Sequence, residues 1–178
     1  MTQILTYSSN LELDNSDTLK RSMPVQKPGH SKQTYGTPWE FIRIAEKRFG
    51  KIVCDLAASA ENAKCDTFYD AAADSLAQPW ATNHPEGVLF LNPPYASIGS
   101  WAQKCAEESK NRSGSILLLV PASVGANWFA NFVHRQAMVL ALSPRLVFEG
   151  EKSSFPKDLI LAVYGQGLSG FDVWRWKP

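Results

Sequence analysis

Hydrophobic positions along the chain follow two kinds of spacing. Helical spacing, in which apolar residues recur every three or four positions, occurs over residues 38–49, 98–110 and 126–135. Uninterrupted apolar runs, which are typical of strands buried on both faces of a parallel sheet, occur at 52–55, 88–91 and 116–120, and further candidate strands are 139–142, 146–148 and 159–164. Helices that alternate with buried strands predict an α/β fold, with a mostly parallel sheet, helices on both faces and a C-terminal antiparallel hairpin.

The first helix has clear boundaries in the sequence. Thr37-Pro38-Trp39-Glu40 has the form of a capping box with proline at the first helical position, and Gly50 stands where a helix is expected to end. The preceding residues 1–34 are rich in small polar residues and lysine and show no sustained period. We therefore expect a flexible N-terminal arm over residues 1–34 and one folded domain over residues 35–178.

Composition limits the classes of protein to which the chain can belong. With 178 residues, 44% of them hydrophobic, it is long enough to bury one substantial core. Its apolar runs are far shorter than the roughly 20 residues that cross a bilayer, and its N-terminus lacks the features of a secretory signal. The three cysteines form no CxxC pair and suit reduced thiols. We expect a cytoplasmic protein with no metal and no membrane partner.

The strongest chemical motif is Asn92-Pro93-Pro94-Tyr95, which follows a buried strand and precedes an amphipathic helix. Ligands of open α/β sheets bind beyond the carboxyl ends of such strands. The prolines make the turn stiff, so the Asn92 side-chain oxygen and the Pro93 carbonyl can accept the two hydrogens of one amino group. Held in this way, an aryl amine favours the pyramidal form whose lone pair attacks a methyl group. The Tyr95 ring would offer a face on which an extruded base stacks.

Two alternatives to this interpretation follow from the residues alone. Asn-Pro begins rigid turns in proteins of every kind, so the motif can also be purely structural. If it is catalytic, its two acceptors suit any planar amino group, including adenine N6, cytosine N4, an RNA base and a protein glutamine amide.

From Thr37 to about Tyr164 the chain resembles the small N-6-adenine methyltransferases of phages and prophages. The matching residues, in the expected order, are Thr37-Pro38, Phe49-Gly50, Asp55-Leu56-Ala57-Ala58, Glu61-Asn62-Ala63-Lys64-Cys65, Tyr69, Asp74-Ser75-Leu76, Trp80, Asn92 to Tyr95, Trp101, Leu117 to Ala122 and Trp128-Phe129. The resemblance implies a Rossmann-like class I methyltransferase fold. Because only 36 residues separate Asp55 from Asn92, this part of the sheet is expected to be abbreviated.

The resemblance also implies S-adenosylmethionine as the cofactor. Asp55, with Ala57 and Ala58, would take the place of the family's first cofactor motif, and Thr37 and Pro38 that of the segment over the methionine end. A carboxylate at a strand end can pair with the cofactor's amino group or sulfonium, and small residues let its backbone approach. The glycine-rich turn of larger methyltransferases is absent, and Asp55 can also be a simple strand-end cap.

Two further acids are candidate cofactor ligands. Asp70 follows a candidate short strand at 67–69 and would accept hydrogen bonds from the ribose hydroxyls. Asp74 would accept from the adenine amino group of the cofactor. Both also fit an ordinary solvated turn.

Together these features predict an enzyme that transfers a methyl group from S-adenosylmethionine to adenine N6 in double-stranded DNA. If a phage or prophage encodes it, it would act in the cytoplasm of the bacterial host cell. The alternatives are another planar amino group as acceptor, or a catalytically silent domain that binds the cofactor or DNA. The net charge of +1 restricts DNA contacts to local ones. Candidates for such contacts are Lys20, Arg21, Lys27 and Lys32 of the arm, and Trp174-Arg175-Trp176-Lys177, which also suits a terminal strand.

Overall fold

The computed structural model describes residues 35–177, which form a six-stranded sheet in the order β1-β2-β3-β5-β4-β6. The strands are β1 (Ile52–Asp55), β2 (Val88–Leu91), β3 (Ile116–Pro121), β4 (Met138–Ser143), β5 (Leu159–Tyr164) and β6 (Gly170–Arg175). The α-helices are α1 (Trp39–Phe49), α2 (Trp80–Asn83), α3 (Ile98–Glu108) and α4 (Asn127–Phe132). The predicted arm, with its four basic residues, lies outside the described residues.

The first three strands are parallel neighbours, as their apolar runs predicted. β1 pairs with β2, and β2 with β3, so the carboxyl ends of all three meet at one edge of the sheet. Every residue of β2 and β3 is buried. Asp55, Asn92 and Pro121 therefore come together at this edge, although long segments of chain separate them.

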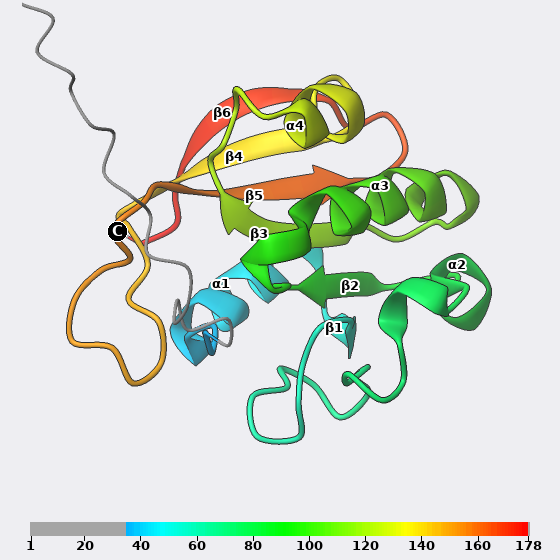
Figure 1. Ribbon diagram of the computed structural model, residues 1–178, viewed down its shortest axis with the longest axis horizontal. Helices are drawn as coiled ribbons and strands as arrows, with labels where there is room; N and C mark the ends of the chain where they lie inside the picture. Colours follow the sequence, from blue (N-terminus) through cyan, green and yellow to red (C-terminus); the bar gives the residue numbers. More distant parts are fainter. Residues whose placement is uncertain (1–34, 178) are drawn as a thin grey trace, which may run out of the picture. The chain divides into compact units, whose positions relative to one another are not determined.

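The predicted C-terminal antiparallel pair is also confirmed. β5 lies between β3 and β4 and runs antiparallel to both (Figure 1). The strand predicted at 146–148 was wrong: Leu146 and Phe148 are buried in the core, but both long edges of β4 are already taken by β5 and β6. Residues 146 and 148 alternate with exposed Val147 as they would in a strand, but no unpaired edge of β4 is left for this segment to pair with.

The last strand resolves the two interpretations of the C-terminal aromatic segment. β6 pairs in parallel with β4 at the edge of the sheet. Trp174 and Trp176 are buried, 7% and 5% exposed, and their rings contact Phe41 of α1. The prediction that these two tryptophans contact nucleic acid was therefore wrong, because their indole rings are buried in the core.

Helices cover both faces of the sheet, as predicted. α1 packs through Phe41, Ile42 and Ala45 against one face. α3 and α4 pack against the other, where the ribbon shows them in front of the strands (Figure 1). Within residues 35–177, no helix is long and apolar enough to cross a membrane.

The predicted capping box at the start of α1 was wrong. The helix begins after Pro38, whose carbonyl accepts the first helical hydrogen bond from Ile42 at 3.2 Å, and no side chain caps it. The Thr37 hydroxyl is engaged elsewhere, as described below. Gly50 ends the helix with φ 104°, a conformation that side chains disfavour.

The segment between β1 and β2 is abbreviated, as expected. In place of a second full strand, residues 67–69 form a single parallel bridge, Asp55 to Phe68. Backbone hydrogen bonds on both sides of the bridge hold this segment beside β1. A one-turn 3-10 helix (Ser75–Ala77) and α2 complete the connection to β2.

Candidate active site

The Asn92 side chain lies at the carboxyl end of β2 with all its polar atoms engaged. Its Nδ2 donates to the Tyr35 carbonyl oxygen at 2.9 Å and to Thr37 Oγ1 at 3.2 Å. Its Oδ1 accepts a hydrogen bond from the Tyr95 hydroxyl at 3.1 Å. The chain segment just before α1 therefore crosses directly over the Asn-Pro-Pro-Tyr turn.

A cavity of about 590 Å³ opens beside Asn92. Six of the predicted site residues line it: Ala57, Ala58, Asp70, Asp74, Asn92 and Pro94. Five do not: Thr37, Pro38, Asp55, Pro93 and Tyr95. The structure thus brings the small residues after β1, the two acids of the following loop and the Asn-Pro-Pro-Tyr turn to one cavity.

Asp55 lies behind the wall of this cavity and holds its loop in place. Its carboxylate oxygens accept backbone hydrogen bonds from Ala57 at 3.3 Å and Lys64 at 3.1 Å, and the residue is only 3% exposed. Burial raises the pKa of Asp55 to about 6, and the two backbone N–H groups oppose this rise. In this structure the carboxylate shapes the loop rather than facing the cavity.

The stability of the fold should therefore depend on pH through Asp55. Because its pKa is raised in the folded state, the protonated form is favoured by folding, and this stabilisation is lost as the pH rises through about 6. The free energy of unfolding should fall by roughly 2 kcal/mol between pH 4 and 7, relative to the non-titrating Asp55→Asn variant. Urea unfolding of both proteins over this range measures the difference, and parallel curves would contradict the buried position of Asp55.

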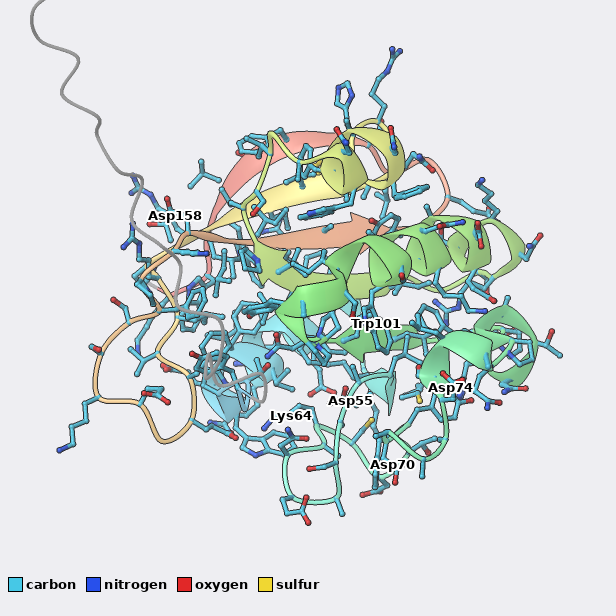
Figure 2. The ribbon with its side chains drawn as sticks, in the orientation of Figure 1. Asp55, Lys64, Asp70, Asp74, Trp101 and Asp158 are labelled. Carbon is cyan, nitrogen blue, oxygen red and sulfur yellow. The ribbon has the colours of Figure 1, made fainter. Side chains whose placement is uncertain are left out.

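The two other acids lie on the loop that leads to α2. In Figure 2, Asp70 lies below Asp55 and Asp74 lies to its right, and Trp101 of α3 lies above all three. Asp70 Oδ1 accepts from the Ala73 backbone at 2.9 Å, and the residue is exposed. Asp74 has φ 44° and ψ 70°, a left-handed conformation that a non-glycine residue rarely adopts. Such backbone conformations concentrate at functional sites.

Aromatic rings surround Tyr95. Its ring stacks beside Tyr35 with centroids 6.4 Å apart and meets Phe155 edge-on at 5.8 Å. Phe148 contacts both Tyr35 and Phe155. Burial raises the pKa of the Tyr95 phenol above its ordinary value, so the hydroxyl is a hydrogen-bond donor at neutral pH.

An ion pair joins the loop after β1 to the long connection between β4 and β5. Lys64 Nζ lies 3.0 Å from both Glu149 carboxylate oxygens and over the Trp39 ring. The Glu149 backbone donates to the Gly36 carbonyl at 2.9 Å. A side chain at Gly36 would collide with the Glu149 carboxylate. Lys64 and Glu149 are 85 residues apart, and nothing in the sequence indicated the pair.

Sequence reasoning missed several residues of the cavity. Leu56, Ser59, Asn62, Tyr69, Leu76 and Tyr35 also line it. Trp101 of α3 is 9% exposed and its ring stacks on that of Trp80 with centroids 6.2 Å apart, and the residue also lines the cavity. Tyr69 is held by His84 at 3.1 Å and Asn83 at 3.0 Å. Leu56, Tyr69 and Leu76 are among the residues that resemble the family, and this resemblance could have identified them as cavity residues.

Known proteins resemble this chain in sequence and, weakly, in structure. The model of the DNA N-6-adenine-methyltransferase (Dam) family matches residues 25–159. The DNA N-6-adenine-methyltransferase of Escherichia phage T1 is 27% identical over 143 residues, which are 80% of this chain and 58% of the phage protein. The protein YfdM of Escherichia coli (strain K12), which is named as a methyltransferase, is 37% identical over 76 residues. These residues make up 39% of this chain and 82% of YfdM.

This chain therefore spans little more than half the length of the phage T1 relative. Among solved structures, a predicted O-methyltransferase, protein Atu636 from Agrobacterium tumefaciens, aligns with TM-score 0.38 and 15% identity, over 75% of this chain and 85% of that one. The fold assignment rests on the strand order and helix placement described above. Because the family model covers most of the chain, including both sides of the cavity, this protein belongs to the DNA N-6-adenine-methyltransferase (Dam) family.

Proposed function

We propose that this protein transfers the methyl group of S-adenosylmethionine to the exocyclic N6 amino group of adenine in double-stranded DNA. The observation that carries the proposal is the Asn92 amide, held at the wall of a ligand-sized cavity within the region that matches the family. The phage T1 relative, which has this activity in its name, supports the choice of adenine in DNA.

The cavity fits the proposed cofactor in size and in the chemistry of its walls. Its volume of about 590 Å³ lies within the range of roughly 300–1,000 Å³ typical of small-molecule sites. Ala57 and Ala58 leave the backbone after β1 open to a ligand. Leu56, Leu76 and Trp101 supply apolar surface, and Asp70 and Asp74 supply the acceptors that hydroxyl and amino groups need. When bound, S-adenosylmethionine supplies an electrophilic methyl group.

We assign the cofactor contacts to the residues that line the cavity. Asp70 would accept from ribose hydroxyls and Asp74 from the cofactor's adenine amino group. Ala57 and Ala58 would contact the cofactor through their backbone. Asp55, whose carboxylate is turned to the loop backbone, would act on the cofactor through the shape of that loop.

The target amino group would lie against the Asn-Pro-Pro-Tyr turn. Asn92 Oδ1 and the Pro93 carbonyl would accept its two hydrogens, which directs the nitrogen lone pair away from the ring and toward the methyl carbon. The cofactor, held by the residues that line the cavity, would supply the methyl group to this nitrogen, its sulfur would keep the electron pair of the carbon–sulfur bond, and the amine would lose one proton. Tyr95 would contact the flipped base by stacking.

The decisive experiment incubates the purified full-length chain with methyl-labelled S-adenosylmethionine and unmethylated double-stranded DNA. The DNA is then digested to nucleosides, and the labelled nucleoside is identified. Label in N6-methyldeoxyadenosine is expected. Label in N4-methyldeoxycytidine, or transfer only to RNA or to a glutamine-containing protein offered in parallel, would replace DNA adenine as the acceptor. Absence of transfer to every substrate would refute methyl transfer.

Asp74 offers a test of the cofactor assignment. Asparagine adopts the left-handed conformation of this position readily, so Asp74→Asn should keep the backbone and remove only the charged acceptor. We expect the affinity for S-adenosylmethionine to fall about tenfold, the effect of one hydrogen bond to a charged group. Calorimetric titration measures this, with Asp66→Asn, on the same loop but away from the cavity lining, as the matched control. Equal affinities of the two variants would exclude Asp74 from the cofactor site.

A further inference from the structure

The orientation of the Asn92 amide is decided by groups outside the Asn-Pro-Pro-Tyr motif. The two ends of an amide have nearly the same size, so hydrogen bonds determine which end points where. In this structure both Nδ2 hydrogens have acceptors, the Tyr35 carbonyl at 2.9 Å and Thr37 Oγ1 at 3.2 Å. If the amide turned over, Oδ1 would face the Tyr35 carbonyl, which has no hydrogen to donate.

Thr37 is well placed for this single purpose. Its residue is 2% exposed, so water cannot readily replace its hydroxyl as the acceptor. The hydroxyl does not cap α1, although the sequence there has the form of a capping box. Thr37 also does not line the cavity. The Thr37 hydroxyl can therefore affect methyl transfer through its hydrogen bond with the Asn92 amide.

The segment that bears these two acceptors is anchored from outside. The Gly36 carbonyl accepts from the Glu149 backbone at 2.9 Å, and the Glu149 carboxylate pairs with the buried Lys64 at 3.0 Å. The Tyr35 ring stacks on Phe148 with centroids 4.9 Å apart. Because the anchors come from the loop after β1 and from the β4–β5 connection, residues 35–37 have a defined position over Asn92.

The opposite end of the amide is occupied by a donor. The Tyr95 hydroxyl donates to Asn92 Oδ1 at 3.1 Å. A target amino group needs the same oxygen as its acceptor. Because the Tyr95 hydroxyl donates to it, Oδ1 is directed toward the side of Asn92 where Tyr95 and its aromatic neighbours lie.

We propose that the Thr37 hydroxyl and the Tyr35 carbonyl are positioning groups for methyl transfer, which hold Oδ1 of Asn92 toward the target amine, and that the Tyr95 hydroxyl satisfies this oxygen until the amine replaces it. The inference rests on the proposed function. It moves Thr37 from the cofactor site, where the resemblance placed it, to the support of the amine-binding group. Without the Thr37 hydroxyl, the amide keeps one of its two anchors and spends more time turned over.

The test compares three substitutions at Thr37. Thr37→Val removes the hydroxyl and keeps the side-chain volume, Thr37→Ala removes the hydroxyl together with volume, and Thr37→Ser keeps the hydroxyl. Thr82→Val, at an exposed position of α2, is the matched control. For each full-length protein, the single-turnover rate of methyl transfer to DNA is measured at saturating S-adenosylmethionine, together with the cofactor affinity by calorimetry and the melting temperature.

We expect Thr37→Val and Thr37→Ala to lower the single-turnover rate about tenfold, the effect of one lost hydrogen bond. Thr37→Ser and Thr82→Val should stay within about twofold of wild type. Cofactor affinity should stay within about twofold in all four, because Thr37 acts through Asn92. In an Asn92→Ala background, Thr37→Val should have no further effect on the rate, since the group that it positions is gone.

Four results would overturn the inference while the wild type remains active. The first three are an unchanged rate in both variants that lack the hydroxyl, an equal loss in Thr37→Ser, and a loss of cofactor affinity that accounts for the whole effect. The fourth is an additive effect of Thr37→Val in the Asn92→Ala background, a comparison that needs only one folded Thr37 variant. If the wild type transfers no methyl group to DNA, the proposed function itself fails, and the inference fails with it.

Discussion

Replacement of Asn92 by alanine is expected to lower the rate of methyl transfer by about 10²–10³-fold, the loss seen when one preorganised polar contact to a reacting group is removed. Alanine leaves the Pro93 carbonyl as an acceptor but removes Oδ1, so the amine would lose the contact that directs its lone pair. The backbone of the turn should persist, because Pro93 and Pro94 restrict it independently of the side chain.

Cofactor affinity separates this effect from a collapse of the site. Calorimetric titration of Asn92→Ala with S-adenosylmethionine should give an affinity within a few-fold of wild type, since Asn92 forms only one part of the cavity wall. Asn111→Ala, at an exposed position after α3, is the matched control and should be fully active. If Asn92→Ala methylates DNA at the wild-type rate, Asn92 does not hold the target amine.

Replacement of Arg112 by alanine is expected to destabilise the fold by about 3–4 kcal/mol. The guanidinium is 3% exposed and donates to four backbone carbonyls, those of His84, Glu86, Gly87 and Ser115, at 2.8–3.1 Å. These carbonyls belong to the turns that begin β2 and β3. Without the guanidinium they would lose their donors in a place that water reaches poorly, which is costly for each group.

Thermal unfolding of the full chain measures this effect as a fall in melting temperature of roughly 10 °C. Arg145→Ala is the matched control, because Arg145 is exposed and pairs with Asp158, and such surface pairs contribute at most about 1 kcal/mol. Arg112→Lys should recover only part of the stability, since one ammonium cannot reproduce the planar fork. A melting temperature of Arg112→Ala equal to that of Arg145→Ala would show that the four carbonyls find other donors.

The elements that sequence alone predicted well are those with strong local signals. β2 and β3 are uninterrupted apolar runs, and α3 repeats apolar residues at helical spacing, so both kinds of element follow from the period of burial. The end of β2 could be recognised because the two prolines of Asn-Pro-Pro-Tyr end a strand. The hydrogen-bond acceptors of the motif also indicated a functional site. The predicted strand at 146–148 failed because burial was mistaken for pairing.

The site shows the same division. The small residues after β1, Asp70 and Asp74 were found by their order along the chain, and they do line the cavity. Thr37 and Asp55 were found as well, but their side chains have other partners than expected: Asn92 for the Thr37 hydroxyl, and the loop backbone for the Asp55 carboxylate. A residue pattern can indicate that a side chain is near a site, but the direction of that side chain depends on contacts distant in sequence.

By itself, the sequence determined the α/β class, the parallel strands and the position of the Asn-Pro-Pro-Tyr motif at the end of a strand, because each depends on short-range periodicity or on a few adjacent residues. Only the tertiary structure decided what supports that motif. Three contacts join positions that are far apart along the chain: those of Asn92 with residues 35–37, of Lys64 with Glu149, and of Arg112 with the turn before β2. Such contacts form only when packing brings their partners together, and local sequence has no period that records them.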